Sequence, residues 1–141
     1  MASNGTTENM VEEVAANYSG YRSFKDLECW KACLEVRRWL ASVVKSFPKE
    51  ERYELVSQMK RASRSTTANI AEGYGRFHFQ ENIQFCRTSR GSLYELIDHL
   101  SVAVDEEYIS QEKSDEGEAL IRKSIAIING YIKYLQNQKA R

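Results

Sequence analysis

Near the middle of the chain lies the stretch Lys60-Arg61-Ala62-Ser63-Arg64-Ser65-Thr66-Thr67-Ala68-Asn69-Ile70-Ala71-Glu72-Gly73-Tyr74-Gly75-Arg76. It has too many small residues for an ordinary surface helix and too many polar ones for an ordinary core helix. Read at helical spacing, one line of positions is apolar at its start and small thereafter: Val56, Met59, Ser63, Thr66, Ile70 and Gly73. A second line is mostly polar: Arg61, Ser65, Ala68 and Glu72. We predict a helix that packs inward by its small side and ends at Gly73-Tyr74-Gly75, where a glycine takes the left-handed conformation.

Three more segments have helical patterns. Ser23 and Asp26 have the spacing of a capping box, and Pro48 suits the first position of the next helix. After His78, apolar positions repeat at intervals of four and three as a bundle seam: Phe79, Ile83, Cys86, Arg90, Leu93, Ile97, Leu100 and Val104. We predict helices at about 24–46, 48–74, 78–107 and 111–137. Short connections make them antiparallel neighbours, giving an all-α, up-down four-helix bundle over residues 21–138.

The fourth helix has two adjacent apolar stripes. One consists of Ile121, Ile125, Ile128, Ile132 and Leu135, and the other of Leu120, Ile127, Tyr131 and Tyr134. One stripe is enough for the core of a single chain, so the second favours contact with another subunit. The alternative is a single wide core face.

Composition limits the possible functions. The 141 residues suit one domain, and 20 basic side chains balance 20 acidic ones. Nucleic-acid binding therefore needs a local basic patch. We expect residues 1–20 to form a flexible tail without a signal peptide, no membrane span, and a cytoplasmic protein with three reduced, mostly buried cysteines.

The sequence offers no set of residues for catalysis, metal or cofactor. His78 and His99 are too far apart on one helix to share a metal, and Leu96 stands where a bundle-type di-iron site needs glutamate. We expect His99 to be partly exposed. Cys29 and Cys33 lack a second pair of ligands. No phosphate-binding or nucleophile motif occurs, so an enzyme is the least favoured class of function.

Basic side chains are the main candidates for a binding site. Lys60, Arg61 and Arg64, with Arg76 at the helix end, can contact phosphates. Alternatively, they form a solvated face paired with acids such as Glu54. A second candidate group mixes basic and aromatic residues in the manner of single-strand binders: Lys25, Arg76, Arg87 and Arg90 with Phe77, Phe79 and Phe85.

A polar network within the bundle is also predicted. Its members are Asn69, Glu72, Arg90 and Glu95. As a hypothesis, Arg90 turns from the third helix toward Glu72 or Asn69 on the second, since a partly buried charge needs partners. Gly91 costs ~1 kcal/mol relative to alanine inside a helix, which predicts that another backbone passes close to it.

Several of these motifs resemble a known family. They include Phe24-Lys25-Asp26-Leu27 with Trp30, Phe47-Pro48 with Glu51, Asn69-Ile70-Ala71-Glu72-Gly73 with Gly75-Arg76, and Arg90-Gly91-Ser92-Leu93-Tyr94-Glu95. Together they resemble the bacterial four-helix-bundle proteins encoded in intervening sequences of large-subunit ribosomal RNA genes. That family includes the accessory variability determinant proteins of diversity-generating retroelements. The resemblance runs from about Tyr21 to Leu135, with departures at Thr66, Thr67 and His78.

The resemblance implies a homopentameric ring without enzymatic activity. It also implies binding to RNA or DNA, or to a nucleoprotein partner such as a reverse transcriptase. The leading hypothesis is therefore an oligomeric bundle that binds nucleic acid through basic side chains. The alternative is a protein-interaction scaffold without nucleic-acid affinity, which the zero net charge permits.

Overall fold

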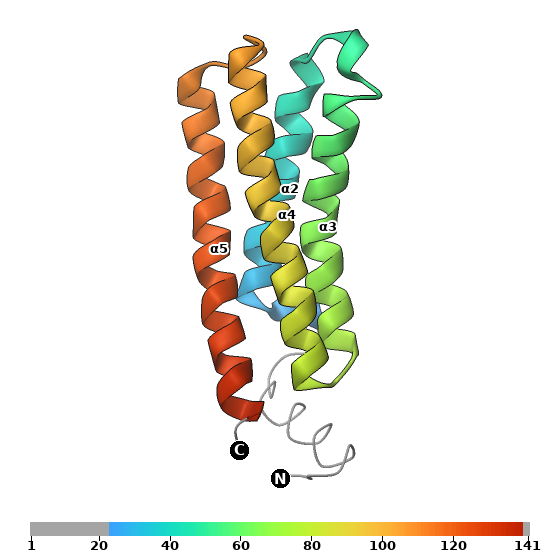
Figure 1. Ribbon diagram of the computed structural model, residues 1–141, viewed down its shortest axis with the longest axis vertical. Helices are drawn as coiled ribbons and strands as arrows, with labels where there is room; N and C mark the ends of the chain where they lie inside the picture. The colour runs from blue at the N-terminus through green and yellow to red at the C-terminus, as the bar shows by residue number, and fades with distance from the viewer. Residues whose placement is uncertain (1–22, 140–141) are drawn as a thin grey trace.

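The computed structural model describes residues 23–139, and the tail expected at residues 1–20 lies outside them. Four long helices run up and down alternately (Figure 1): α2 (Glu28–Val43), α3 (Leu55–Gly75), α4 (Phe79–Asp105) and α5 (Gln111–Lys139). Each packs on the next, and α5 closes the bundle against α2. The all-α, up-down four-helix prediction is confirmed.

Two of the predicted helix starts are wrong. The capping box at Ser23 and Asp26 is present, but it caps a single 3-10 turn, η1 (Phe24–Asp26), before Leu27 becomes extended. Pro48 likewise precedes a 3-10 turn, η3 (Lys49–Glu51), so α3 begins seven residues later than expected. A further 3-10 turn, η2 (Val44–Ser46), follows directly after α2.

Contacts with the connection between α4 and α5 explain the late start of α3. The Glu51 carboxylate accepts the Leu55 backbone N–H at 3.2 Å and the Tyr108 hydroxyl at 2.7 Å. The ring of Tyr108 lies 5.3 Å from that of Phe47. These interactions fix residues 47–54 as a compact turn at the end of the bundle, instead of a straight helical extension.

The predicted inward face of α3 is confirmed. All six positions of the small line are buried: Val56, Met59, Ser63, Thr66, Ile70 and Gly73. The same is true of the first α5 stripe: Ile121, Ile125, Ile128, Ile132 and Leu135. The second α5 stripe is half-buried against the core of the same chain, at Leu120, Ile127, Tyr131 and Tyr134.

Close packing between helices is found at one of the two glycines where it was predicted: at Gly73, the end of the small line of α3, but not at Gly91. A Cβ at Gly73 would lie 2.7 Å from Asn82 Oδ1 and 2.9 Å from Phe85 Cβ on α4. At Gly91 a Cβ would meet nothing within 4 Å, so the predicted close backbone at that residue is wrong. The left-handed residue after α3 is Phe77, with φ of 52°, and not a glycine.

The three cysteines are free and buried, as expected. Burial raises the pKa of Cys33 to about 11 and that of Cys86 to about 12, and it raises the pKa of Cys29 as well. Over residues 23–139, no helix combines the length and the apolar character that a membrane crossing requires.

Candidate nucleic-acid interface

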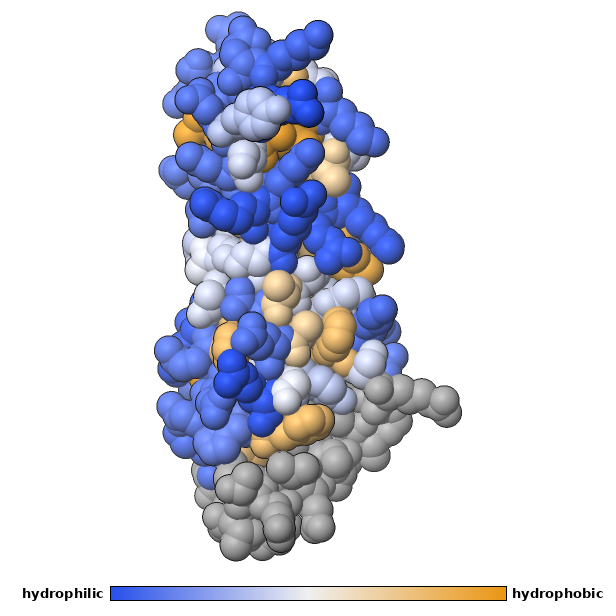
Figure 2. Space-filling view, turned by 90° about the vertical axis from the view of Figure 1, so that its right-hand side faces the viewer, coloured by the Kyte–Doolittle hydropathy of each residue, from blue (hydrophilic) through white to orange (hydrophobic). Residues whose placement is uncertain are grey.

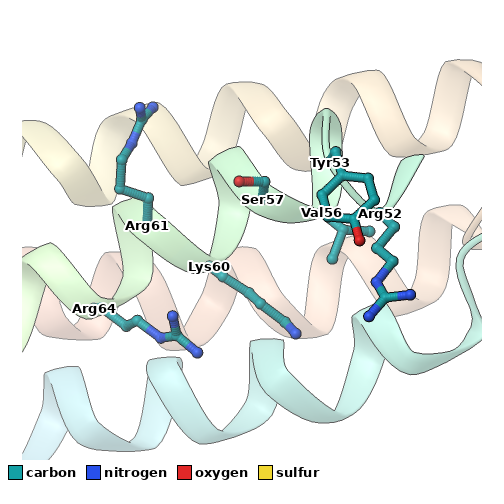
Figure 3. A pocket seen from close by; sticks show the side chains of 7 residues that line it. All are labelled: Arg52, Tyr53, Val56, Ser57, Lys60, Arg61 and Arg64. Atoms are coloured by element: carbon teal, nitrogen blue, oxygen red, sulfur yellow. The ribbon is translucent and has the colours of Figure 1, made fainter. Parts of the chain in front are cut away.

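The basic side chains of α3 lie on its outer surface and project to two different sides. In Figure 3, Lys60 and Arg64 extend toward α2, as does Arg52 from the turn before α3, whereas Arg61 points the opposite way, toward α4. Lys60 and Arg64 are one helical turn apart on α3, and Arg52 lies in the turn that precedes this helix. The result is a row of three cationic groups along the α2 side of α3.

The charges on these two sides are in different environments. Arg61 Nη2 lies 3.7 Å from Glu95 Oε2, and the side chains of this ion pair are 71% and 41% exposed. Within residues 23–139, neither Lys60 nor Arg64 forms an ion pair with a carboxylate. The alternative of a face paired with nearby acids therefore holds for Arg61, whose partner is Glu95 and not Glu54, whereas the Lys60 and Arg64 charges remain available to a ligand.

The row of cations borders an open hollow of about 490 Å³. It is lined by Arg52, Tyr53, Val56, Ser57, Lys60, Arg61 and Arg64. Tyr53 is 81% exposed, and the guanidinium carbon of Arg52 lies 5.2 Å from the centre of its ring. The hollow therefore joins basic groups to an exposed aromatic ring, a combination suited to phosphates and to a flat ligand.

A second hollow of about 300 Å³ adjoins the first, because Arg64 lines both. It is formed by Phe24, Lys25, Trp30, Arg37, Arg64, Thr67, Ala68 and Ala71. Arg37 Nη1 donates to Thr67 Oγ1 at 2.8 Å, which holds the guanidinium across the boundary between α2 and α3. Among residues 23–139, the two hollows have six basic lining residues and no acidic one.

Figure 2 views the molecule from the α3 side. Strongly hydrophilic side chains cover much of the upper half of this face, which corresponds to the first half of α3, and less polar patches appear lower down. The second hollow includes the less polar side chains Phe24, Trp30, Ala68 and Ala71.

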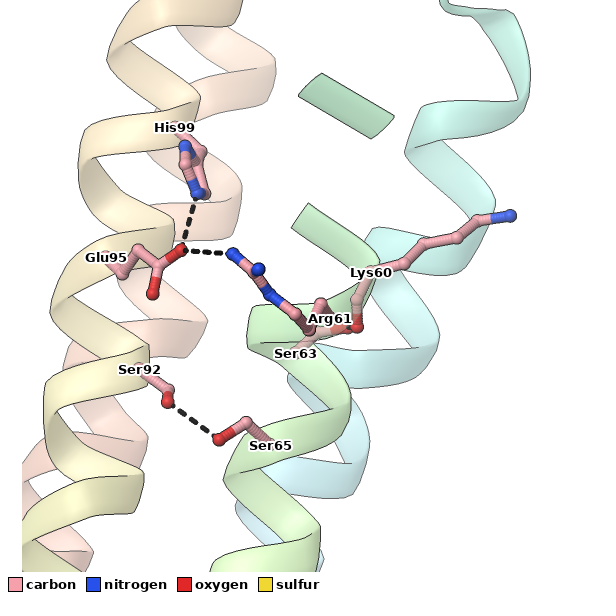
Figure 4. Close-up of polar contacts among 7 residues, drawn as sticks. All are labelled: Lys60, Arg61, Ser63, Ser65, Ser92, Glu95 and His99. Carbon is pink, nitrogen blue, oxygen red and sulfur yellow. Dashed lines mark hydrogen bonds and ion pairs between the residues drawn. The ribbon is translucent and has the colours of Figure 1, made fainter. Parts of the chain in front are cut away.

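On the other side of α3, a polar cluster joins the helix to α4 (Figure 4). Glu95 Oε2 forms an ion pair with Arg61 at 3.7 Å and also lies 2.9 Å from His99 Nε2. One turn away, the hydroxyls of Ser65 and Ser92 are 2.9 Å apart. His99 is 8% exposed, so the prediction of a partly exposed histidine is wrong. The spacing of four between Glu95 and His99 was a sequence signal for this contact.

The predicted network of four residues does not form as a unit. Arg90 Nη1 donates to Asn129 Oδ1 on α5 at 2.7 Å, so the hypothesis that it turns toward Glu72 or Asn69 on α3 is wrong. Asn69 donates to the backbone oxygen and hydroxyl of Ser65, both at 2.8 Å. Arg90, which belongs to the predicted seam of α4, therefore faces the boundary between α4 and α5. Helical spacing alone did not specify which neighbouring helix this residue would face.

Of the other basic candidates from the sequence, Lys25 lines the second hollow, whereas Arg76 and Arg87 line neither hollow. Arg76 pairs with Glu72 at 3.0 Å and Glu81 at 3.4 Å, and it stacks over the ring of Phe85 at 5.2 Å. Arg87 is exposed on α4 and donates to Gln84 at 2.8 Å. Among the proposed stacking partners, Phe79 is a core residue, 2% exposed, and Phe77 is 39% exposed.

Three lining residues were not predicted from the sequence: Arg52, Tyr53 and Arg37. None of them carried a signal at helical spacing, because the positions of Arg52 and Tyr53 depend on the turn before α3 and that of Arg37 depends on packing between helices. No group of three or more His, Cys, Asp or Glu residues within 23–139 is arranged to hold a metal ion.

Comparison with known proteins agrees with the fold and identifies the family. A search of curated proteins gave no match. The sequence model of the 23S rRNA-intervening sequence protein family matches residues 25–130, a range that spans most of the bundle and more than half of the chain. The chain therefore belongs to the 23S rRNA-intervening sequence protein family.

Proposed function

We propose that this protein is a non-enzymatic helical bundle that binds nucleic acid through the basic row of Arg52, Lys60 and Arg64. The observation that supports this most is the segregation of charge: within the part of the chain that the structure describes, the two adjoining hollows are lined by six basic residues and no acidic one, whereas the charges of the chain as a whole cancel. Phosphates are the ligands that such a surface suits, because neutralising them releases counterions into solution.

Arg64 is the central residue of the proposed interface. It lines both hollows, is exposed, and has no carboxylate partner within the described residues. Its planar guanidinium can donate two parallel hydrogen bonds to one phosphate, whereas Lys60 acts as a point charge. Contacts of this kind position a nucleic acid without reading its sequence, so binding is expected to depend little on base sequence.

We further propose that the chain assembles as a homo-oligomer, with the homopentameric ring implied by family resemblance. The half-buried second stripe of α5, at Leu120, Ile127, Tyr131 and Tyr134, is the surface that could gain from a neighbouring subunit. A ring would repeat the basic row around its circumference and raise the avidity for a long RNA. A reverse transcriptase or another nucleoprotein is the partner this arrangement would suit.

The test of function is binding of labelled RNA and DNA oligonucleotides measured by fluorescence anisotropy over a series of salt concentrations. Affinity is expected to fall steeply as salt rises. The double variant Lys60→Ala/Arg64→Ala should lose most binding while keeping its helical circular dichroism. The matched control is Arg87→Ala, which removes an exposed charge from α4 and should change the affinity little.

A protein-interaction scaffold is the second candidate. The observation that favours it is the exposure of two large apolar side chains on α4, Tyr94 at 51% and Val102 at 39%. A scaffold of this kind would show no measurable affinity for RNA or DNA even at low salt. That result would remove the nucleic-acid proposal and leave the α4 surface as the candidate interface.

A further inference from the structure

We propose that the two adjoining hollows form one track for a single strand of nucleic acid, with bases stacked on Tyr53 at one end and on Trp30 at the other. This inference rests on the proposed function and adds the form of the ligand. It depends on where the structure places aromatic rings relative to the basic row, which charge alone does not determine.

Tyr53 has the properties of a stacking platform. It is 81% exposed and lies outside the core, so packing of the bundle does not account for its ring. The Arg52 guanidinium lies over the ring at 5.2 Å and helps to hold it in place. Figure 3 shows the two side chains together at the end of the hollow beyond Lys60. An unpaired base stacking on the ring would bring its own phosphate within reach of these cations.

Trp30 provides the second aromatic surface. It lines the other hollow with Arg37 and Lys25, and the edge-to-face contact with Phe24, at 5.5 Å between ring centres, fixes its orientation. Trp30 is half-buried, so part of the indole remains accessible. Arg37, held by Thr67, supplies a positive charge beside it.

The length of α3 that borders the two hollows fits a short strand. Arg64 lines both hollows, so the two meet at its side chain. From Val56 to Ala71 the α3 axis advances about 22 Å at 1.5 Å per residue. That length accommodates about six phosphates at the 3.4 Å spacing of a stacked strand, and fewer when the strand is extended.

A single strand can use both the row of cations and the aromatic rings of the track, whereas a duplex can use only the cations. Paired bases present their faces only at the helix ends, so a duplex could contact the row of cations but would leave Tyr53 and Trp30 without stacked bases. The aromatic rings at both ends of the basic row therefore favour unpaired RNA or DNA over a duplex.

The experiment compares a labelled 12-nucleotide single strand with a hairpin duplex of the same composition, by anisotropy at fixed low salt. The variants are Tyr53→Leu, which removes the ring, and Tyr53→Phe, which keeps it. Tyr94→Leu is the matched control, since Tyr94 is also an exposed tyrosine but lies on α4. Tryptophan fluorescence in a Trp39→Phe background reports on Trp30, because the chain has two tryptophans.

The expected result is tighter binding of the single strand than of the hairpin. Tyr53→Leu should weaken single-strand binding about fivefold or more, whereas Tyr53→Phe and Tyr94→Leu should leave it nearly unchanged. Trp30 fluorescence should be quenched by the single strand. Equal affinity for the two ligands, with no effect of Tyr53→Leu, would overturn this inference but leave the proposed function standing. Failure of both ligands to bind would overturn both.

Discussion

Arg61 and Arg64 are three residues apart in α3, but the structure gives their charges different surroundings. Arg61 faces Glu95, while Arg64 faces the hollows without a carboxylate partner in the described part of the chain. An exposed ion pair is worth little to stability, at about 0–1 kcal/mol. It nevertheless reduces the positive potential that a phosphate would meet. Arg64 is therefore expected to matter more to binding than Arg61.

Glu95→Gln tests this difference directly. The amide oxygen can still accept from His99, so the contact between the two α4 side chains can be kept, while the negative charge beside Arg61 is lost. We expect affinity for a single-stranded RNA to rise, by up to about fivefold. Anisotropy measures the change.

The matched control is Glu72→Gln, which removes the charge beside Arg76, away from the basic row. It should leave the affinity unchanged. An equal gain in the two variants would mean that net charge, rather than the position of Arg61, determines binding.

At the level of the helices, the crossing of α3 and α4 depends on Gly73. Adding a methyl group there would bring it within 2.7 Å of Asn82 Oδ1, 2.9 Å of Phe85 Cβ and 3.2 Å of the Asn82 backbone oxygen. Gly73→Ala should therefore lower the free energy of unfolding, by about 1–3 kcal/mol. Urea denaturation followed by circular dichroism measures this.

Gly91→Ala is the control within α4. Since a Cβ there meets nothing within 4 Å and alanine favours helix, this variant should be more stable than wild type, by about 0.5–1 kcal/mol. If Gly73→Ala were as stable as Gly91→Ala, the close contact at Gly73 would be refuted.

The elements that the sequence predicted well are those set by local periodicity. The buried line of α3 from Val56 to Gly73 and the first stripe of α5 follow from helical spacing alone, because each helix must bury one face. The start of α3 did not follow, because it depends on Glu51 bonding to Tyr108, 57 residues away in the chain. The spacing of residues along a helix carries no information about such long-range contacts.

The candidate site was predictable to a similar extent. Lys60, Arg61 and Arg64 were found as a group because they are close in sequence. Within residues 23–139, Arg61 pairs with Glu95 and Arg64 has no carboxylate partner, and this difference depends on which neighbouring helix each side chain faces. The partner of Arg90 was assigned to the wrong helix for the same reason: a seam residue borders two neighbours, and spacing does not distinguish between them.

At the scale of the whole molecule, the buried thiols link folding to pH. The folded protein holds the protons of Cys33 and Cys86 more tightly than an unfolded chain does, whose thiols have a pKa of about 8.5. Their pKa values in the fold are about 11 and about 12. This stabilisation is complete below about pH 8.5 and is lost as pH rises toward those values. The urea concentration at the midpoint of denaturation should therefore decrease as the pH is raised from 8 to 10.5.

Cys86→Ala separates the thiol effect from other alkaline titrations. The variant should be less stable than wild type at pH 8, because it leaves a small cavity in the core. Its stability should then decline less steeply with pH, since one buried thiol no longer titrates. Parallel declines of the two proteins would show that deprotonation of Cys86 does not contribute.

The most direct test of the central claim is the slope of log K against log salt concentration for a single-stranded RNA. Each phosphate contact with a single strand contributes about −0.7 to this slope. We predict that Lys60→Ala/Arg64→Ala makes the slope shallower by about 1.4, and that Arg76→Ala/Arg87→Ala leaves it unchanged. A slope that is the same in wild type and in Lys60→Ala/Arg64→Ala would contradict the assignment of the basic row as the nucleic-acid interface.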